Sequence, residues 1–110
     1  MLKKNVLRKK ADFDKLYKSG KSAADRYVVV FVRPNGLEVT RTAFLASKKV
    51  GNSVARNKAR RLMKESYRLS LADIPKGVDI IFIARNTIIN KKQKEVERSM
   101  SAALTKVGIK

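Results

Sequence analysis

A strongly basic stretch at residues 48–68 limits most sharply how this chain folds. These 21 residues hold eight cationic side chains and one carboxylate. A helix over about residues 53–72, turning about 100° per residue, aligns Arg56, Arg60 and Lys64 in one row. The opposite side of that helix carries Ala55, Ala59, Leu62, Ser66 and Leu69. The stretch therefore predicts an amphipathic helix that packs on a core and presents a line of cations to a polyanion.

The composition indicates one compact domain with an anionic partner. The chain has 110 residues, of which 44% are hydrophobic, and this is enough to build a core. Its formal net charge of +18 makes a nucleic acid the expected partner. We therefore expect a single RNA-binding domain over residues 1–110, in which residues 1–10 form a flexible basic arm.

Membranes and secretion are not supported by the sequence. No apolar run approaches the roughly 18 residues of a membrane-spanning helix. The first ten residues lack the apolar segment of a secretion signal. The chain has no cysteine, which suits a cytoplasmic location.

The sequence offers few groups for protein catalysis. It contains no histidine, so the commonest general acid or base and the commonest metal ligand are missing. It has no glycine-rich motif that cradles a nucleotide. Its nine carboxylates form no cluster tighter than the pairs Asp12/Asp14 and Glu95/Glu97, which diverge on a helix. We therefore expect no catalytic residue and no metal ligand in the protein.

The order of apolar patterns predicts a small α/β sandwich. A short helix is expected over residues 12–19, ending at Gly20 in the left-handed conformation. Strands are expected at residues 26–33, 37–47 and 78–85. The third strand is a near-continuous apolar run and is expected to be buried on both faces. Asn90 is expected to cap a last helix, with Gln93 completing a capping box. The apolar stripe of that helix is Val96, Met100, Ala103, Leu104 and Val107.

Three aromatic residues allow two interpretations. Phe13, Tyr17 and Phe31 can be core residues, as aromatic side chains often are. They can also line a groove on which unpaired bases stack, an interaction worth about 1–3 kcal/mol per base. Basic neighbours favour the second interpretation, namely Lys10, Lys15, Lys18 and Arg33.

The start of the basic helix also allows two interpretations. Residues 51–53 supply a flexible glycine and capping oxygens, which is ordinary chemistry for a helix start. Alternatively, free N–H groups there, beside Lys48 and Lys49, hold a phosphate.

The run at residues 47–61 resembles the signature of the bacterial ribonuclease P protein subunit, approximately S-K-K-x-G-x-A-V-x-R-N-x-x-K-R. The centre of this signature is called the RNR motif. The resemblance covers nearly the whole chain, including Phe13 and Tyr17 in a short helix, Arg26 before an aromatic strand, and the apolar run at residues 80–85.

Three positions depart from the family pattern. Ser53 stands where alanine is usual, Lys58 replaces the second arginine of the triplet, and Arg60 stands where lysine is usual. Charge is kept at the last two positions, so the RNA contact is expected to survive. Lys58 loses any bidentate hydrogen bonding that an arginine makes.

The resemblance implies a fold and two RNA sites. The implied fold is an α+β (α/β) two-layer sandwich, ribosomal protein S5 domain 2-like, with a mixed four-stranded sheet packed by helices. In it the RNR helix forms a left-handed βαβ crossover, whereas the general rule favours the right-handed one. The residues that the resemblance implies bind the catalytic RNA are Lys48, Lys49, Asn52, Arg56, Asn57, Lys58, Arg60, Arg61, Lys64 and Arg68. The implied residues of a separate cleft for the 5′ leader of precursor tRNA are Phe13, Tyr17, Phe31, Lys10 and Arg33.

The implied function is that of the protein subunit of ribonuclease P. This subunit assists the Mg²⁺-dependent endonucleolytic removal of the 5′ leader from precursor tRNA, with Mg²⁺ held mainly by the RNA component. The implied partners are ribonuclease P RNA and precursor tRNA, with no membrane and no required protein partner. The main alternative is a general or ribosomal RNA-binding protein without a processing role. A DNA-binding recognition helix and a stand-alone nuclease fit the residues less well.

Overall fold

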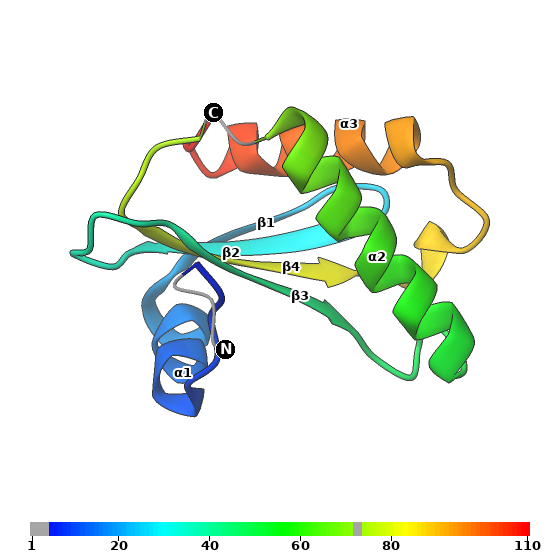
Figure 1. The fold of residues 1–110 in the computed structure, drawn as a ribbon, viewed down its shortest axis with the longest axis horizontal. Coiled ribbons are helices and arrows are strands. Elements are labelled where there is room, and N and C mark those ends of the chain that lie inside the picture. The colour runs from blue at the N-terminus through cyan, green and yellow to red at the C-terminus, as the bar shows by residue number, and fades with distance from the viewer. Residues whose placement is uncertain (1–4, 72–73) are drawn as a thin grey trace.

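A computed structural model describes residues 5–71 and 74–110 and shows a sheet with helices on both faces (Figure 1). The strands are β1 (Lys21–Ala24), β2 (Val28–Pro34), β3 (Arg41–Ala46) and β4 (Val78–Ala84). The helices are α1 (Lys10–Ser19), α2 (Ser53–Ser70), the 3-10 helix η1 (Asn86–Ile88) and α3 (Gln93–Lys106). Helices α2 and α3 cover one face of the sheet, and α1 packs on the other.

The four strands lie in the order β1-β2-β4-β3. The β1–β2 and β2–β4 pairs are antiparallel, whereas β3 and β4 are parallel neighbours joined through α2. In Figure 1, β3 and β4 run in the same direction, α2 lies above them, and the chain passes from β3 in front to β4 behind, so this connection is a left-handed crossover. The mixed sheet and its crossover confirm the expected fold class, against the general preference for right-handed connections.

Successive residues of the central strands point to two separate apolar clusters. Val28 of β2 and Phe82 of β4 belong to the larger cluster, under α2 and α3. Phe82 stacks on Phe44 of β3 with ring centroids 5.4 Å apart. Ile81 faces the other side and packs with Leu16 of α1. Strand β4 is therefore buried on both faces, as its apolar run predicts.

The last helix has the predicted apolar stripe but begins differently. Val96, Met100, Ala103, Leu104 and Val107 are all buried. The N-cap is Lys92 rather than Asn90, and its side chain makes no capping bond. Gln93 does not close a capping box, because its amide donates to Glu97 Oε2 at 2.9 Å. Asn90 instead adopts a φ of 63°, a left-handed conformation that asparagine tolerates better than most residues.

Gly20 ends α1, but not in the predicted left-handed conformation. Its φ of −75° and ψ of 157° are extended. A Cβ at this position would lie 2.5 Å from the Leu16 carbonyl oxygen and 2.8 Å from that of Val32. Glycine is needed here because two backbone segments approach closely, and not because of its freedom at positive φ.

Strand β1 was not predicted, and two other elements are shorter than expected. Residues 21–24 contain no β-branched or aromatic side chain, so they carry no strand signal. The strand expected over residues 37–47 is confined to β3. Helix α2 ends at Ser70, and Ala72 lies outside the described residues.

The N-terminal segment does not match the flexible arm expected over residues 1–10. The Leu7 N–H donates to the Thr42 carbonyl at 2.9 Å, and the Thr42 N–H donates to that of Asn5 at 3.0 Å. Leu7 is only 3% exposed and joins the cluster under α1. Residues 5–7 thus extend the sheet beside β3, and Lys10 already begins α1. Residues 1–4 lie outside the described part of the chain.

Candidate functional site

The start of α2 is fixed by a capping residue. Asn52 accepts a hydrogen bond from the Ala55 N–H on its side-chain oxygen at 3.0 Å. Gly51 has a φ of 143°, which favours glycine, and leads the chain into this cap. The structure therefore supports the helix-start interpretation of residues 51–53. A phosphate beside Lys48 and Lys49 stays a prediction.

The buried face of α2 differs from the predicted one. Ala59, Met63 and Ser66 are its buried residues. Leu69 was expected to face the core but is 56% exposed, whereas Met63 is fully buried. Helix α2 contacts both β3 and α3. Its buried stripe is therefore rotated about the helix axis from the predicted position, toward the side that carries the half-buried Arg56.

The predicted RNA-binding residues lie on α2 and the turn before it. We call this set the α2 cationic surface: Lys48, Lys49, Asn52, Arg56, Asn57, Lys58, Arg60, Arg61, Lys64 and Arg68. Most of these side chains are exposed, and Arg56 and Arg60 are half-buried. Arg60 donates to the Asn57 side-chain oxygen, and Arg68 pairs with Glu65. Among the described residues, Glu65 is the carboxylate that pairs with a cation of this surface.

Arg56 has an unsatisfied donor within this surface. Its Nη2 donates to the Ser53 hydroxyl at 3.3 Å. Its Nε is buried, and no acceptor for it exists among the described residues. A buried guanidinium N–H without a partner is costly, so this side chain is suited to an added anionic acceptor.

The three predicted aromatic residues lie together on the opposite face of the sheet. The Tyr17 ring centroid is 6.5 Å from that of Phe13 and 5.1 Å from that of Phe31. We call these three residues the aromatic surface. Phe13 and Phe31 pack partly into the cluster around Leu16, whereas Tyr17 is 45% exposed. Partial burial raises the pKa of Tyr17. The core interpretation therefore holds in part for Phe13 and Phe31, and the stacking of bases on these rings stays a prediction.

The two basic residues assigned to the cleft flank the aromatic surface. Lys10 is exposed in the first turn of α1, one turn before Phe13. Arg33 lies on β2 two residues after Phe31, and the alternation of the strand puts both on the same face.

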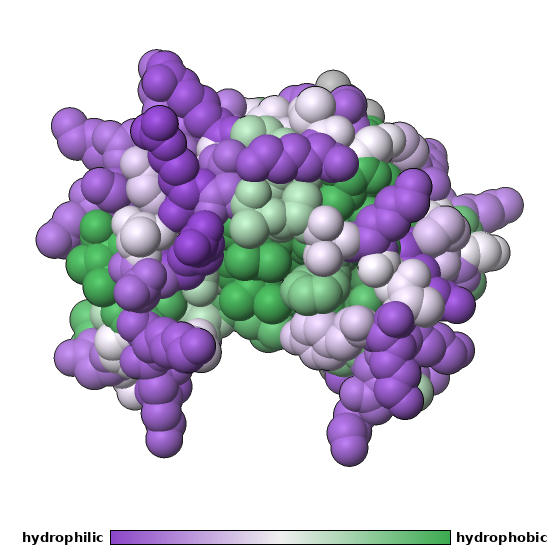
Figure 2. Space-filling model, turned by 180° about the vertical axis from the view of Figure 1, so that it is seen from behind, coloured by the Kyte–Doolittle hydropathy of each residue, from purple (hydrophilic) through white to green (hydrophobic). Residues whose placement is uncertain are grey.

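A cavity joins the aromatic surface to the α2 cationic surface. It measures about 250 Å³, and Phe13 of α1, Leu45 of β3 and Lys64 of α2 are among its lining residues. Seen from behind, apolar residues gather in the middle of the molecule, above a hollow between projecting hydrophilic side chains (Figure 2). The sequence assigned Lys64 to the RNA-subunit site alone, but this residue also lines the cavity beside Phe13.

Arg41 ties α1 to the sheet beside the aromatic surface, and sequence reasoning missed it. Its Nε and Nη2 donate to the two Asp79 carboxylate oxygens at 2.8 and 2.6 Å. Its Nη1 lies 3.3 Å from Asp12 Oδ2, next to Phe13 in α1. Asn35 also donates to Asp79, at 2.8 Å. The pKa of Arg41 is raised, and its hydrogen bonds to Asp79 are the largest cause. Burial opposes this shift, whereas the negative charges of Asp79 and Asp12 add to it.

The described residues, 5–71 and 74–110, contain no group of three or more histidine, cysteine or acidic residues placed to hold a metal ion. No helix among them is long and apolar enough to cross a membrane.

The fold and the cationic crossover helix define a small RNA-binding domain of the α+β class. The family model of Ribonuclease P matches residues 1–108. The Ribonuclease P protein component of Alkaliphilus oremlandii is 43% identical over 105 residues, covering 96% of this chain and 92% of the relative. The chain belongs to the ribonuclease P protein family and is a protein subunit of ribonuclease P.

Other relatives and solved structures agree with this assignment. The Ribonuclease P protein component of Clostridium botulinum strain 657 is 43% identical over 109 residues, with 98% of each chain covered. The RNase P protein of Staphylococcus aureus superposes with a TM-score of 0.85 at 32% identity, covering 97% of this chain and 98% of that one. The RNase P protein of Thermotoga maritima superposes with a TM-score of 0.79 at 32% identity, covering 88% of this chain and 92% of that one.

Proposed function

We propose that this subunit binds ribonuclease P RNA through the α2 cationic surface and the 5′ leader of precursor tRNA through the aromatic surface. The observation that carries this proposal is the shared cavity, which brings Phe13 of α1 and Lys64 of α2 together. A single strand that stacks a base near Phe13 can place its next phosphates against cations of α2. The protein thereby holds the leader against the RNA that cleaves it.

We infer that the chemistry belongs to the RNA component. The chain has no histidine and no cysteine, so it lacks the side chains that most often transfer protons near neutral pH. Mg²⁺ would be held by RNA phosphates rather than by residues of this chain, and it would supply the Lewis-acid chemistry that activates water. The protein's own contribution is to neutralise phosphates, so that RNA and substrate associate at a lower Mg²⁺ concentration. This activity belongs in the cytoplasm, where precursor tRNA is made.

A reconstitution assay tests this function. The full chain is mixed with a bacterial ribonuclease P RNA and precursor tRNA at low Mg²⁺, and the release of the 5′ leader is followed. We expect cleavage that neither component gives alone, without any further protein. Cleavage no faster than with the RNA alone would contradict the proposal and favour general RNA binding. Cleavage by the protein alone would place the chemistry in the chain.

Replacing an exposed aromatic residue tests the leader site. Tyr17→Ala removes a ring that is 45% exposed, so it is expected to cost little stability. One lost stacked base is worth about 1–3 kcal/mol, which predicts roughly 5- to 150-fold weaker binding of precursor tRNA by the holoenzyme. Mature tRNA, which lacks the leader, is expected to bind as before. The measurement is the affinity of the holoenzyme for both tRNAs.

Tyr27→Ala is the matched control for this experiment. Tyr27 is half-buried, its ring contacts Lys91, and it lies outside both proposed RNA surfaces. Tyr27→Ala should leave the ratio of the holoenzyme's affinities for precursor tRNA and mature tRNA unchanged. Equal losses for precursor and mature tRNA with Tyr17→Ala would rule out the leader assignment.

A further inference from the structure

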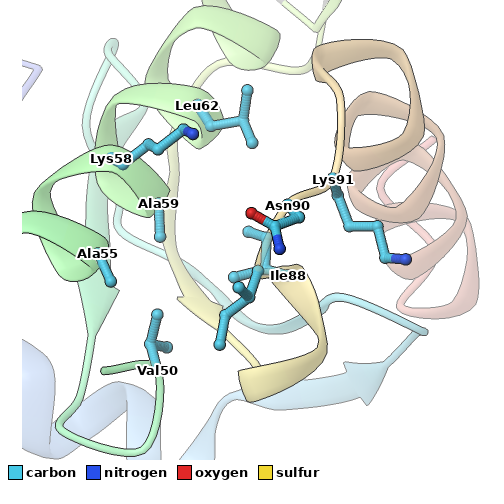
Figure 3. Close-up of a pocket in the computed structure, with 9 residues that line it drawn as sticks. Val50, Ala55, Lys58, Ala59, Leu62, Ile88, Asn90 and Lys91 are labelled. Atoms are coloured by element: carbon cyan, nitrogen blue, oxygen red, sulfur yellow. The ribbon is translucent and has the colours of Figure 1, made fainter. Parts of the chain in front are cut away.

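A small apolar pocket lies between α2 and the segment that joins η1 to α3 (Figure 3). Its volume is about 100 Å³. Its apolar walls are Val50, Ala55, Ala59, Leu62, Ile88 and Ile89. Ala55 and Ala59 lie one turn apart on α2, and their short side chains leave the space open. The pocket lies on the α3 side of α2, away from the aromatic surface.

Polar groups gather at the mouth of this pocket. The side chains of Lys58 and Asn90 point into the space between α2 and the loop (Figure 3). Asn90 is exposed, and its side-chain amide makes no hydrogen bond within residues 5–71 and 74–110. Lys91 is directed elsewhere, with its Nζ 5.4 Å from the centre of the Tyr27 ring. The mouth thus offers one cation and one free amide.

The pocket continues into a basic groove. Lys58 and Leu62 also line an open depression of about 610 Å³ that runs along α2. Arg61 and Lys64 add two cations to this groove. Glu65 is the carboxylate that faces it, and this side chain is already paired with Arg68. An anionic chain lying in the groove would therefore meet mainly positive charge.

We propose that the pocket receives one unstacked base of the RNA partner. This inference rests on the proposed function, because it deepens the contact between α2 and ribonuclease P RNA. Sequence-specific RNA recognition commonly uses bases splayed out of a single strand. In this arrangement Lys58 and Arg61 hold the flanking phosphates, and the apolar walls contact the base.

The dimensions and chemistry of the pocket fit a base that is partly inserted. A cavity of about 150 Å³ holds a whole benzene molecule. The smaller pocket here admits the edge of one ring, while the sugar stays in the groove. The Asn90 amide supplies both a donor and an acceptor, which is what the polar edge of a base requires. Apolar walls alone would also fit a hydrophobic side chain of a protein, but the surrounding cations favour a nucleotide.

Nucleotide binding to the full chain tests the pocket directly. Methyl resonances of Ala55, Ala59 and Ile88 are followed by NMR during titration with AMP, GMP, CMP and UMP. Ribose 5-phosphate is the matched probe, since it carries the phosphate without a base. We expect at least one nucleotide to shift these methyl resonances and ribose 5-phosphate to leave them in place. Identical responses to all probes would mean phosphate binding only and would overturn the proposal.

Two variants test the pocket in the complex with ribonuclease P RNA. Ala55→Leu fills the space, and Asn90→Gly removes the amide at a position whose φ of 63° suits glycine. We expect each to weaken RNA binding about tenfold without changing its salt dependence, because the lost contact is to a base and not to a phosphate. Ala102→Leu on α3 is the matched control and should bind like the unaltered chain.

The outcomes separate this inference from the proposed function. If the unaltered chain fails to bind ribonuclease P RNA, the proposed function fails. If the unaltered chain binds and both variants bind equally well, the pocket proposal alone is wrong. A thermal melt of each variant shows whether it is folded, and Asn90→Gly is expected to melt close to the unaltered chain, because glycine adopts this positive φ without strain.

Discussion

Replacing Asp79 with alanine is expected to lower the free energy of unfolding by about 3–5 kcal/mol, because one partner of a buried ion pair is lost. Asp79 is 6% exposed and accepts both bonds of the Arg41 guanidinium as well as the Asn35 amide. Its removal leaves the Arg41 charge with the single contact to Asp12, at 3.3 Å. Such a loss is a large part of the 5–15 kcal/mol that usually stabilises a whole domain.

Urea unfolding followed by circular dichroism measures this loss. Asp14→Ala is the matched control, because Asp14 is an exposed carboxylate on α1 and should change stability by less than about 0.5 kcal/mol. The double variant Arg41→Ala/Asp79→Ala should be less destabilised than the sum of the two single variants, since it leaves neither charge unpaired. Additive losses would show that the pair does not act as a unit.

The ion pair also has a consequence for the leader site. Arg41 bridges β4 to α1 at Asp12, which precedes Phe13. Loosening this bridge lets α1 move relative to the sheet that carries Phe31. The geometry of the aromatic surface therefore depends on residues that would not themselves touch RNA.

The Arg41–Asp79 pair shows what the sequence could and could not reveal. An aspartate inside the apolar run of β4 signals that a buried charge needs a partner. The identity of that partner depends on the parallel register of β3 and β4, which places Arg41 directly opposite Asp79. These residues are 38 positions apart, so no local pattern joins them.

Elements with a strong apolar pattern were predictable, and those set by tertiary contacts were not. The stripe of α3 repeats with the period of a helix, and the continuous apolar run of β4 is typical of a strand buried on both faces. In α2, contact with both β3 and α3 decides which face is buried, so Met63 lies inside and Leu69 outside. Strand β1 pairs with β2 at the sheet edge through backbone bonds, which need no apolar signal.

The functional surfaces follow the same division. The α2 cationic surface was visible as a run of charges within one helix. The contact of Lys64 with the cavity beside Phe13 requires α1, β3 and α2 to be assembled, so the sequence alone treated the two sites as separate.

Removing the row of cations on α2 is expected to have the largest effect on RNA binding. The triple variant Arg56→Ala/Arg60→Ala/Lys64→Ala removes three proposed phosphate contacts. Each contact contributes about 0.9 units to the dependence of log affinity on log salt, so the slope should flatten by about 2.7 units. At about 0.1 M salt this corresponds to roughly 500-fold weaker binding of ribonuclease P RNA.

The folded state itself should tolerate this change. Like charges four residues apart on a helix repel by about 0.2–0.5 kcal/mol per pair, and alanine is the best helix former. The Arg56 guanidinium also has a buried Nε without an acceptor among the described residues, so its removal relieves a desolvation cost. We therefore expect the triple variant to melt no lower than the unaltered chain, which separates lost binding from lost folding.

A second triple variant distinguishes a specific surface from net charge. Lys92→Ala/Lys94→Ala/Arg98→Ala removes the same number of cations, all of them exposed, from the start of α3. If RNA lies along α2, this variant should keep most of the salt dependence and lose far less affinity. If both variants flatten the slope equally, the RNA responds to the total charge of +18 and α2 is not its particular binding site. Binding isotherms at four or more salt concentrations decide between the two, because the slope counts phosphate contacts whereas a single affinity does not.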